Sequence, residues 1–242
     1  MNQPIELQRS FWNDWNAHNR EFHLSDISED QRGVVVEWLR GLGRTDLNIL
    51  EVGCGAGWLC PSLNAFGRVT ATDLSDEVLA RAKERMPGIS FVAGDFMELS
   101  FEPEQFDVVI ALEVLSHVSD HAAFVAKIAD LLRPGGVLIL ATQNRPVLER
   151  HNTVPEAKPG NLRRWFDRVE LGALLERYVA VEEMRSITPV ASKGPLRLLA
   201  GRQTKRFWRA VSGRAVESAL AKAGFGWTLM VRARKSAPDD PS

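Results

Sequence analysis

Cysteine, tyrosine and long apolar runs are all scarce in this sequence. Only two cysteines, Cys54 and Cys60, and one tyrosine occur among 242 residues. Two cysteines without metal-site spacing exclude a disulfide framework or a cysteine-rich metal site, and we expect a reduced, cytoplasmic setting. No apolar run is long enough to cross a bilayer, and the polar N-terminus is unlike a signal peptide, so neither a membrane span nor export is expected.

An excess of either charge sign is also missing. The chain has 30 Lys and Arg residues against 31 Asp and Glu residues, for a net charge of −1. This balance gives no electrostatic case for nucleic acid binding, so we expect no nucleic-acid partner. The 45% hydrophobic and 25% charged content is ordinary for a soluble globular protein. The length suits one α/β domain with additions.

A glycine-rich turn is the most informative stretch that is present. The apolar run Ile49–Val52 is typical of a buried parallel strand, and Gly53, Gly55 and Gly57 follow at alternate positions. Glycines allow a sharp turn and close approach of a ligand to the backbone. The spacing matches neither the dinucleotide fingerprint nor the phosphate loop. A plain strand-to-helix turn also fits, and Pro61 predicts a helix start close to Gly57.

Acidic residues end three further expected strands. Val69–Asp73 lies at the offset from the glycine turn at which a carboxylate can reach ribose hydroxyls. Residues 89–95 end in Asp95, and residues 106–113 end in Glu113. Because parallel strands present their carboxyl ends at one sheet edge, we expect these acids to lie together where open α/β sheets bind ligands.

With these motifs the chain resembles the class I S-adenosylmethionine-dependent methyltransferases, and within them the type 11 or ubiquinone-pathway O-methyltransferases. The matching segments, in order and spacing, are Glu51-x-Gly53-x-Gly55-x-Gly57, Asp73-Leu74-Ser75, Gly94-Asp95-Phe96, Leu112–Val118 and Leu132–Gly136. The similarity covers about residues 45–145. It implies a Rossmann-like, seven-stranded, mostly parallel sheet with helices on both faces and an antiparallel last strand.

The resemblance also implies S-adenosyl-L-methionine as the cofactor and assigns residues to it. Asp73 would bind the ribose, Asp95 and the Phe96 backbone would read the adenine edge, and Leu74 and Phe96 would sandwich the purine. The methionine end would be held by Glu51, Leu112 and the turn of Gly53, Gly55 and Gly57. Alternatively, Asp73 and Asp95 are turn or cap residues. No metal site is expected.

His117 follows the fourth expected strand, near the point where the methyl group should emerge. Its ordinary pKa lies near neutrality, so it is the candidate catalytic base. Similar enzymes have a histidine here but usually a Glu before it, where this chain has Ser116, so a structural histidine is an equal alternative. Candidate substrate-binding residues, including one from the N-terminal segment, are Trp15, Asn144, Arg145 and Trp165.

Three segments fall outside the motif region. Residues 1–44 are expected to form an N-terminal helical cap on the domain of residues 45–242, with a helix over residues 33–42 and with Trp12 and Trp15 either packed or acting as a lid. Residues 143–159 are expected to be a loop. Residues 188–226 form a basic amphipathic insertion. Its apolar side could lie on the core, or residues 193–222 could form a lid or contact a membrane surface.

The sequence therefore predicts a cytoplasmic S-adenosylmethionine-dependent methyltransferase acting on a small-molecule or lipid-like acceptor, at a hydroxyl oxygen. Two alternatives stay open at this point. The first is N-methylation of an amine metabolite or natural-product intermediate, which needs less of a base. The second is a binding protein that has kept the fold without turnover, because fold does not fix function.

Overall fold

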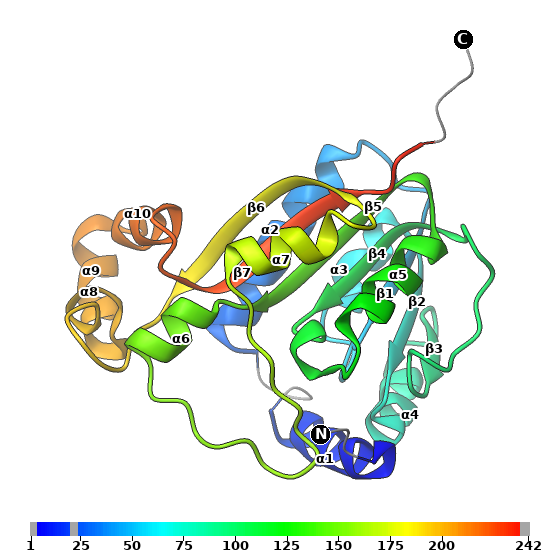
Figure 1. The fold of residues 1–242 in the computed structure, drawn as a ribbon, viewed down its shortest axis with the longest axis horizontal. Helices are drawn as coiled ribbons and strands as arrows, with labels where there is room; N and C mark the ends of the chain where they lie inside the picture. Colours follow the sequence, from blue (N-terminus) through cyan, green and yellow to red (C-terminus); the bar gives the residue numbers. More distant parts are fainter. Residues whose placement is uncertain (1–3, 20–23, 238–242) are drawn as a thin grey trace.

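A seven-stranded sheet in the order β3-β2-β1-β4-β5-β7-β6 forms the centre of the molecule (Figure 1). The structure is a computed structural model that describes residues 4–19 and 24–237. Strands β1 to β5 run parallel, whereas β7 is antiparallel to both β5 and β6. The predicted Rossmann-like topology is confirmed. The strands are β1 (Leu47–Val52), β2 (Gly67–Asp73), β3 (Ser90–Ala93), β4 (Phe106–Leu112), β5 (Leu132–Gln143), β6 (Ala180–Pro189) and β7 (Gly226–Arg234).

Helices cover both faces of the sheet because side chains alternate along each buried strand. In β1, Ile49 belongs to the core cluster of α2 (Asp26–Gly41), α3 (Cys60–Leu63) and α4 (Asp76–Arg85). Its neighbour Leu50 belongs to the cluster of α5 (His121–Leu131) and α7 (Arg168–Leu175). Both residues are fully buried. The near-continuous apolar run in β1 therefore reflects burial on two sides.

Side-chain caps fix where several helices begin. Asp120 accepts a hydrogen bond from the backbone of Ala123 at the start of α5, and Asp167 and Glu170 form a capping box at the start of α7. Ser25 caps α2, which therefore begins at Asp26, earlier than the helix expected over residues 33–42.

The two helices within residues 1–44 lie in different places. Helix α2 packs into the sheet core through Val35, Trp38 and Leu39. Helix α1 (Ile5–Asn19) lies apart from the sheet, below the carboxyl ends of the strands and against α4 (Figure 1). Only α1 therefore has the position of a cover.

Two local predictions were wrong. The helix after the glycine turn begins at Cys60 and has four residues, because Gly57 has a φ of 74° that a helix does not contain. Residues 143–159 are not all loop: they contain α6 (Arg145–His151), whose first turn includes Pro146.

The insertion between β6 and β7 folds into three short helices at one end of the molecule (Figure 1). They are α8 (Arg197–Ala200), α9 (Arg202–Ser212) and α10 (Ala215–Lys222). An apolar side of α9 on the core was one interpretation of the sequence, and it is wrong. Phe207 and Val211 are 59% and 64% exposed, whereas Lys205 is buried.

Candidate functional site

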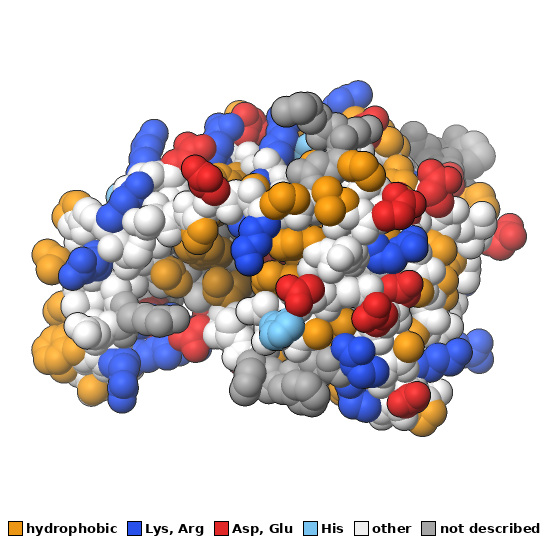
Figure 2. Space-filling model, turned by 90° about the horizontal axis from the view of Figure 1, so that it is seen from below, with side chains coloured by type: hydrophobic (Ala, Val, Ile, Leu, Met, Phe, Trp, Pro, Cys, Tyr) orange, Lys and Arg blue, Asp and Glu red, His pale blue; other side chains and the backbone are white. Residues whose placement is uncertain are grey.

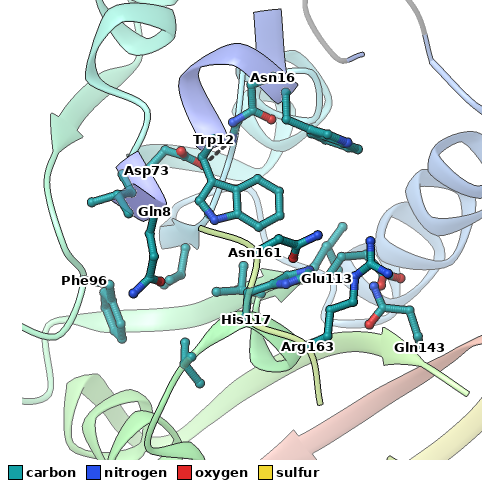
Figure 3. Close-up of a pocket in the computed structure, with 18 of the residues that line it drawn as sticks. Gln8, Trp12, Asn16, Asp73, Phe96, Glu113, His117, Gln143, Asn161 and Arg163 are labelled. Carbon is teal, nitrogen blue, oxygen red and sulfur yellow. Dashed lines mark hydrogen bonds between the residues drawn. The ribbon is translucent and has the colours of Figure 1, made fainter. Parts of the chain in front are cut away.

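A cavity of about 440 Å³ opens at the carboxyl ends of β1, β2, β4 and β5, between the sheet and α1. Figure 3 shows polar and aromatic side chains from α1, from the ends of the strands and from the segment after α6 around this cavity. Of the residues predicted for the site, eight line its wall: Gly53, Gly55, Asp73, Leu74, Asp95, Phe96, Leu112 and His117. Trp15 and Trp165 line it as well.

The glycine turn leaves no room for side chains on this wall. Gly53 and Gly55 have φ angles of 70° and 55°, which other residues rarely adopt. A Cβ atom on Gly53 would lie 2.2 Å from Val114 Cγ2, and one on Gly55 would lie 3.0 Å from Asn16 Oδ1. Gly57, also at positive φ, faces Met86 and Phe91 instead of the cavity. The turn thus exposes bare backbone to a ligand.

Asp73 connects the end of β2 to the glycine turn. Its Oδ2 accepts a hydrogen bond of 2.7 Å from the Gly55 backbone N–H, and its Oδ1 accepts one of 2.8 Å from Ser75 N–H. Burial raises the pKa of this carboxyl, although these hydrogen bonds oppose the rise. Each oxygen can accept a second hydrogen bond, so Asp73 is both a turn residue and an acceptor at the cavity wall.

Beyond the glycine turn and Asp73, the adjoining part of the cavity wall is mostly apolar and includes one further acid, Asp95. Asp95 accepts from the Met97 backbone N–H at 3.0 Å, and Phe96 packs edge-on against Phe124 with ring centroids 5.4 Å apart. Leu74 and Leu112 complete a slot suited to a flat ring.

Glu51 lies behind the cavity wall, not on it. It is 2% exposed, and Cys60 donates its thiol to Oε2 at 3.2 Å. Burial, together with Cys60 and Asp73, raises the pKa of Glu51 well above its usual value. In this structure Glu51 therefore supports the turn from beneath.

The glycine turn, Asp73 and the mostly apolar wall that adjoins them form one half of the cavity, and the second half is lined by Gln31, Glu113, Gln143 and Arg163. His117 lies between the two halves (Figure 3). Its Nδ1 lies 2.6 Å from the Leu162 carbonyl oxygen, which only accepts, so Nδ1 carries the proton and Nε2 keeps its lone pair. Trp12 packs edge-on against the imidazole at 4.7 Å. Burial lowers the pKa of His117 to about 4, and the Arg163 charge acts in the same direction. The ring is therefore neutral at physiological pH.

Two polar residues in the second half of the cavity, Gln31 and Glu113, were not assigned roles from the sequence. Glu113 has a φ of 61°, and its Oε1 accepts from Gln31 Nε2 at 2.6 Å and from Thr228 Oγ1 at 3.1 Å. The Oε1 atom of Gln31 is buried and has no hydrogen-bond partner among the described residues. Arg163 and Gln143 also point inward (Figure 3).

Asn144 and Arg145, predicted as substrate contacts, do not line the cavity. Asn144 donates to the carbonyls of Gly224 and Gly226, at 3.0 and 2.8 Å. Arg145 forms ion pairs with Asp167 and Glu170, so it joins α6 to the cap of α7. The structure gives both side chains roles in holding the surrounding elements.

No group of His, Cys, Asp and Glu side chains within residues 4–19 and 24–237 is arranged to hold a metal ion. The polar groups described above are among those that line the cavity. They comprise hydrogen-bond acceptors along the glycine wall, and a neutral imidazole, an amide, a carboxylate and a guanidinium in the second half.

Comparisons with known proteins place this site in a family context. A family model described as "Methyltransferase domain" matches residues 50–140. A ubiquinone biosynthesis O-methyltransferase of Rhodopseudomonas palustris (strain TIE-1) is 38% identical over 104 residues, which are 41% of this chain and 41% of that protein. The matched part thus spans about two fifths of the length of such curated relatives.

Solved structures share the fold over nearly the whole chain. A putative methyltransferase from Haloferax volcanii, in complex with the Trm112 activator, has a TM-score of 0.66 at 18% identity, covering 93% of this chain and 97% of its own. The N-methyltransferase NodS from Bradyrhizobium japonicum, bound to S-adenosyl-L-homocysteine, has a TM-score of 0.64 at 18% identity, covering 95% and 98%. Residues 50–140 of this chain therefore match a methyltransferase domain, and the fold of the chain is the one that these solved methyltransferases share.

Proposed function

We propose that this chain transfers a methyl group from S-adenosyl-L-methionine to a hydroxyl oxygen of a small-molecule or lipid-like acceptor. One observation supports this proposal most directly. A single cavity joins a wall of bare glycine backbone, Asp73, Asp95 and Phe96 to a second half that contains neutral His117. A donor and an acceptor bound in the two halves would meet beside His117, and holding them in line is the main requirement of methyl transfer.

The residues of the first half fit the donor. The Asp73 carboxylate offers free lone pairs to ribose hydroxyls, and the slot of Leu74, Phe96 and Leu112 suits a purine. The turn at Gly53 and Gly55 lines the cavity with backbone that carries no side chains, so a ligand can approach it closely. The sulfonium of the donor, when bound, supplies an electrophilic methyl group.

The second half suits an acceptor that donates hydrogen bonds. His117 Nε2 would accept the proton of the acceptor hydroxyl, and the resulting imidazolium would keep its Nδ1–H bond to the Leu162 carbonyl. The unpartnered Gln31 Oε1 would accept from a second polar group of the acceptor. The cavity is also lined by three aromatic side chains, which would contact apolar parts of the acceptor: Trp12, Trp165 and Trp227.

N-methylation is the second candidate, and the Glu113 carboxylate in the cavity favours it. A carboxylate there would attract a protonated amine, and an amine needs less help from a base. NodS, a structural neighbour, is an N-methyltransferase. A non-catalytic binding protein with the same fold is the third reading, and turnover separates it from both enzymes.

Calorimetric titration with S-adenosylhomocysteine tests the donor site. We expect Asp73→Asn to weaken binding by roughly 10- to 100-fold, because the neutral amide is a poorer partner for the ribose hydroxyls. Asp46→Asn, a change to an exposed carboxylate paired with Arg44, is the control and should leave binding unchanged. Thermal unfolding of each variant checks that the fold is retained. Equal affinities for folded Asp73→Asn and wild type would remove the assignment.

Turnover with a labelled methyl donor tests the acceptor atom. Matched panels of alcohols, phenols and amines would be incubated with the whole chain, and products would be identified by mass spectrometry. Methylation of hydroxyl compounds supports the proposal, whereas products from amines alone would favour the second candidate. Donor binding without any release of S-adenosylhomocysteine across both panels would point to a binding protein.

A further inference from the structure

The outward side of α8 and α9 is an exposed apolar surface at one end of the molecule. Leu198 and Leu199 on α8 are 70% and 37% exposed, and Phe207 and Val211 on α9 are 59% and 64% exposed. These four residues, which we call the apolar patch, are half of the eight exposed large hydrophobic residues in the described chain. Figure 2 shows hydrophobic side chains gathered at this end, with Lys and Arg side chains among them. Such clustering on a small domain indicates an interaction surface.

Ion pairs on the inner side of α9 hold the helix in this orientation. Lys205, which is buried, lies 3.3 Å from Asp26 and 3.6 Å from Glu217. Arg209 donates to Glu217 at 2.7 Å. Turning the apolar side inward would break these pairs and leave buried Glu217 with Arg214 as its one remaining ion-pair partner among the described residues, which is unfavourable for a buried carboxylate. The ion pairs on the inner side of α9 therefore fix the orientation in which its apolar side faces outward.

Four cations without ion pairs to other described residues lie in the same segment as the apolar patch, residues 193–222. Lys193, Arg197, Arg206 and Lys222 are exposed, and none forms an ion pair with another described residue. The segment from Lys193 to Lys222 contains only one acidic residue, Glu217, and that residue is buried and paired. The outer surface therefore combines apolar side chains with positive charge that nothing in the described chain neutralises.

We propose that the apolar patch and these four cations dock on the surface of an anionic membrane. Apolar and aromatic side chains enter the interface between headgroups and acyl chains, and Lys and Arg attract anionic headgroups. A second copy of the chain presenting the same face would bring like charges together, so the charge favours a partner of opposite sign. Among the described residues no helix is long and apolar enough to cross a bilayer, so contact would be peripheral.

Backbone contacts connect this surface to the wall of the cavity. Ser192 and Lys193, just before α8, donate to the carbonyl of His151 at the end of α6, at 2.9 and 3.0 Å. Leu148, on the same short helix, lines the cavity. Docking would therefore place the cavity near the bilayer, although the proposal itself does not depend on methyl transfer.

Flotation of the whole chain with vesicles tests the proposal. Vesicles of phosphatidylcholine mixed with phosphatidylglycerol should bind the chain, whereas pure phosphatidylcholine vesicles should bind it at least tenfold more weakly, and salt should reduce binding. The triple variant Lys193→Gln, Arg197→Gln, Arg206→Gln should lose about fivefold per cation, or roughly 100-fold in all. The control is the double variant Lys83→Gln with Arg68→Gln, which removes two exposed cations elsewhere and should lose far less than the 25-fold expected for two cations of the surface, at about fivefold each.

The apolar contribution is tested separately. Phe207→Ser with Val211→Ser should weaken binding to the mixed vesicles by about tenfold or more. Val169→Ser, which changes a 79% exposed residue on α7, should not weaken it. The proposal is overturned if the wild type does not float with mixed vesicles, or if the patch variants bind as well as their controls. It is equally overturned if sedimentation shows a dimer that the Phe207 and Val211 changes dissociate while vesicle binding is absent.

Discussion

At Gly53 the backbone has a φ of 70°, and the space beside its Cα is filled by Val114, whose Cγ2 would lie 2.2 Å from an added Cβ. Gly53→Ala therefore combines backbone strain with a collision in a packed region. We expect it to lower the free energy of unfolding by about 2–4 kcal/mol. Urea denaturation followed by circular dichroism measures this change.

A glycine in an ordinary helical position provides the control for Gly53. Gly33 lies on the exposed side of α2, and an added Cβ there meets nothing within 4 Å. Gly33→Ala should stabilise the protein by about 0.5–1 kcal/mol, because alanine restricts the unfolded chain and favours the helix. If both variants were equally stable, the tight packing of the glycine turn would have to be reconsidered.

His117→Asn isolates the role of the imidazole in turnover. An asparagine amide can still donate to the Leu162 carbonyl, but it offers no basic lone pair where Nε2 lies. With a hydroxyl acceptor we expect kcat/KM to fall roughly 100-fold. Binding of S-adenosylhomocysteine should stay within about twofold of the wild type, since the loss concerns proton transfer.

The pH profile gives a second readout for His117. Because its pKa is about 4, wild-type kcat/KM should show no histidine inflection between pH 6 and 7 and should decline only toward pH 4. A variant that keeps full activity with a hydroxyl acceptor would leave His117 with only a structural role.

At the scale of elements, α1 lies apart from the sheet and packs against α4 (Figure 1). It is held to α4 by Asn16, which donates to Ser75 Oγ at 2.7 Å, and by Asn13, which donates to Asp76 at 2.8 Å. Trp12 on the same helix covers His117. These contacts predict a cover that opens as a unit.

Hydrogen exchange measured by mass spectrometry tests α1 as a cover. Asn16→Ala removes a buried hydrogen bond worth about 1 kcal/mol, so peptides from α1 should exchange roughly fivefold faster. Asp14→Asn, a change to a 78% exposed side chain on the same helix, serves as the comparison. In the wild type, S-adenosylhomocysteine should slow exchange of α1. Exchange that responds neither to the Asn16 change nor to the ligand would show that α1 is a fixed part of the core.

Most elements were predictable because local signals determined them. Buried strands such as β1 have apolar runs ending at glycine or acid, and α7 begins at an Asp-x-x-Glu capping box. The orientation of α9 was not predictable, since an amphipathic pattern does not say which side faces inward. Asp26, far away in the sequence, decides this by pairing with Lys205 and Arg209.

The candidate site was predictable on the donor side and less so on the acceptor side. The acids at strand ends follow from the topology, whereas Gln31 reaches the cavity from a helix that otherwise packs on the core. It precedes Val34, Val35 and Trp38 on the apolar stripe of α2, and a lone polar residue in such a stripe is the signal that could have indicated it. No local signal marks Thr228 as the partner of Glu113.

At the scale of the whole molecule, ion pairs connect α2, near the start of the chain, with the insertion and with β6. Asp26 and Asp30 on α2 accept from Lys205 and Arg214 of the insertion, and Glu37 pairs with Arg185 of β6. Burial tends to raise the pKa of Asp26, but the neighbouring Lys and Arg charges outweigh it and hold the pKa below its usual value. Loss of such pairs in acid should loosen the insertion along with α2.

The buried neutral histidine adds a second, larger pH dependence to the stability of the whole protein. The pKa of His117 is about 4 in the folded state and 6.5 in the unfolded chain, so between these values the unfolded state binds more protons. Stability should therefore fall as pH decreases from 7 to 4, by about 3 kcal/mol from this residue. Urea denaturation at pH 7 and pH 4.5 measures the loss. In His117→Asn the loss over the same interval should be smaller by about 2–3 kcal/mol, because the group that gains the proton is gone. If the free energy of unfolding fell by the same amount in wild type and variant, the imidazole would not be held neutral in the folded protein. The proposal that Nε2 of His117 accepts a proton from the acceptor would then lose its physical basis.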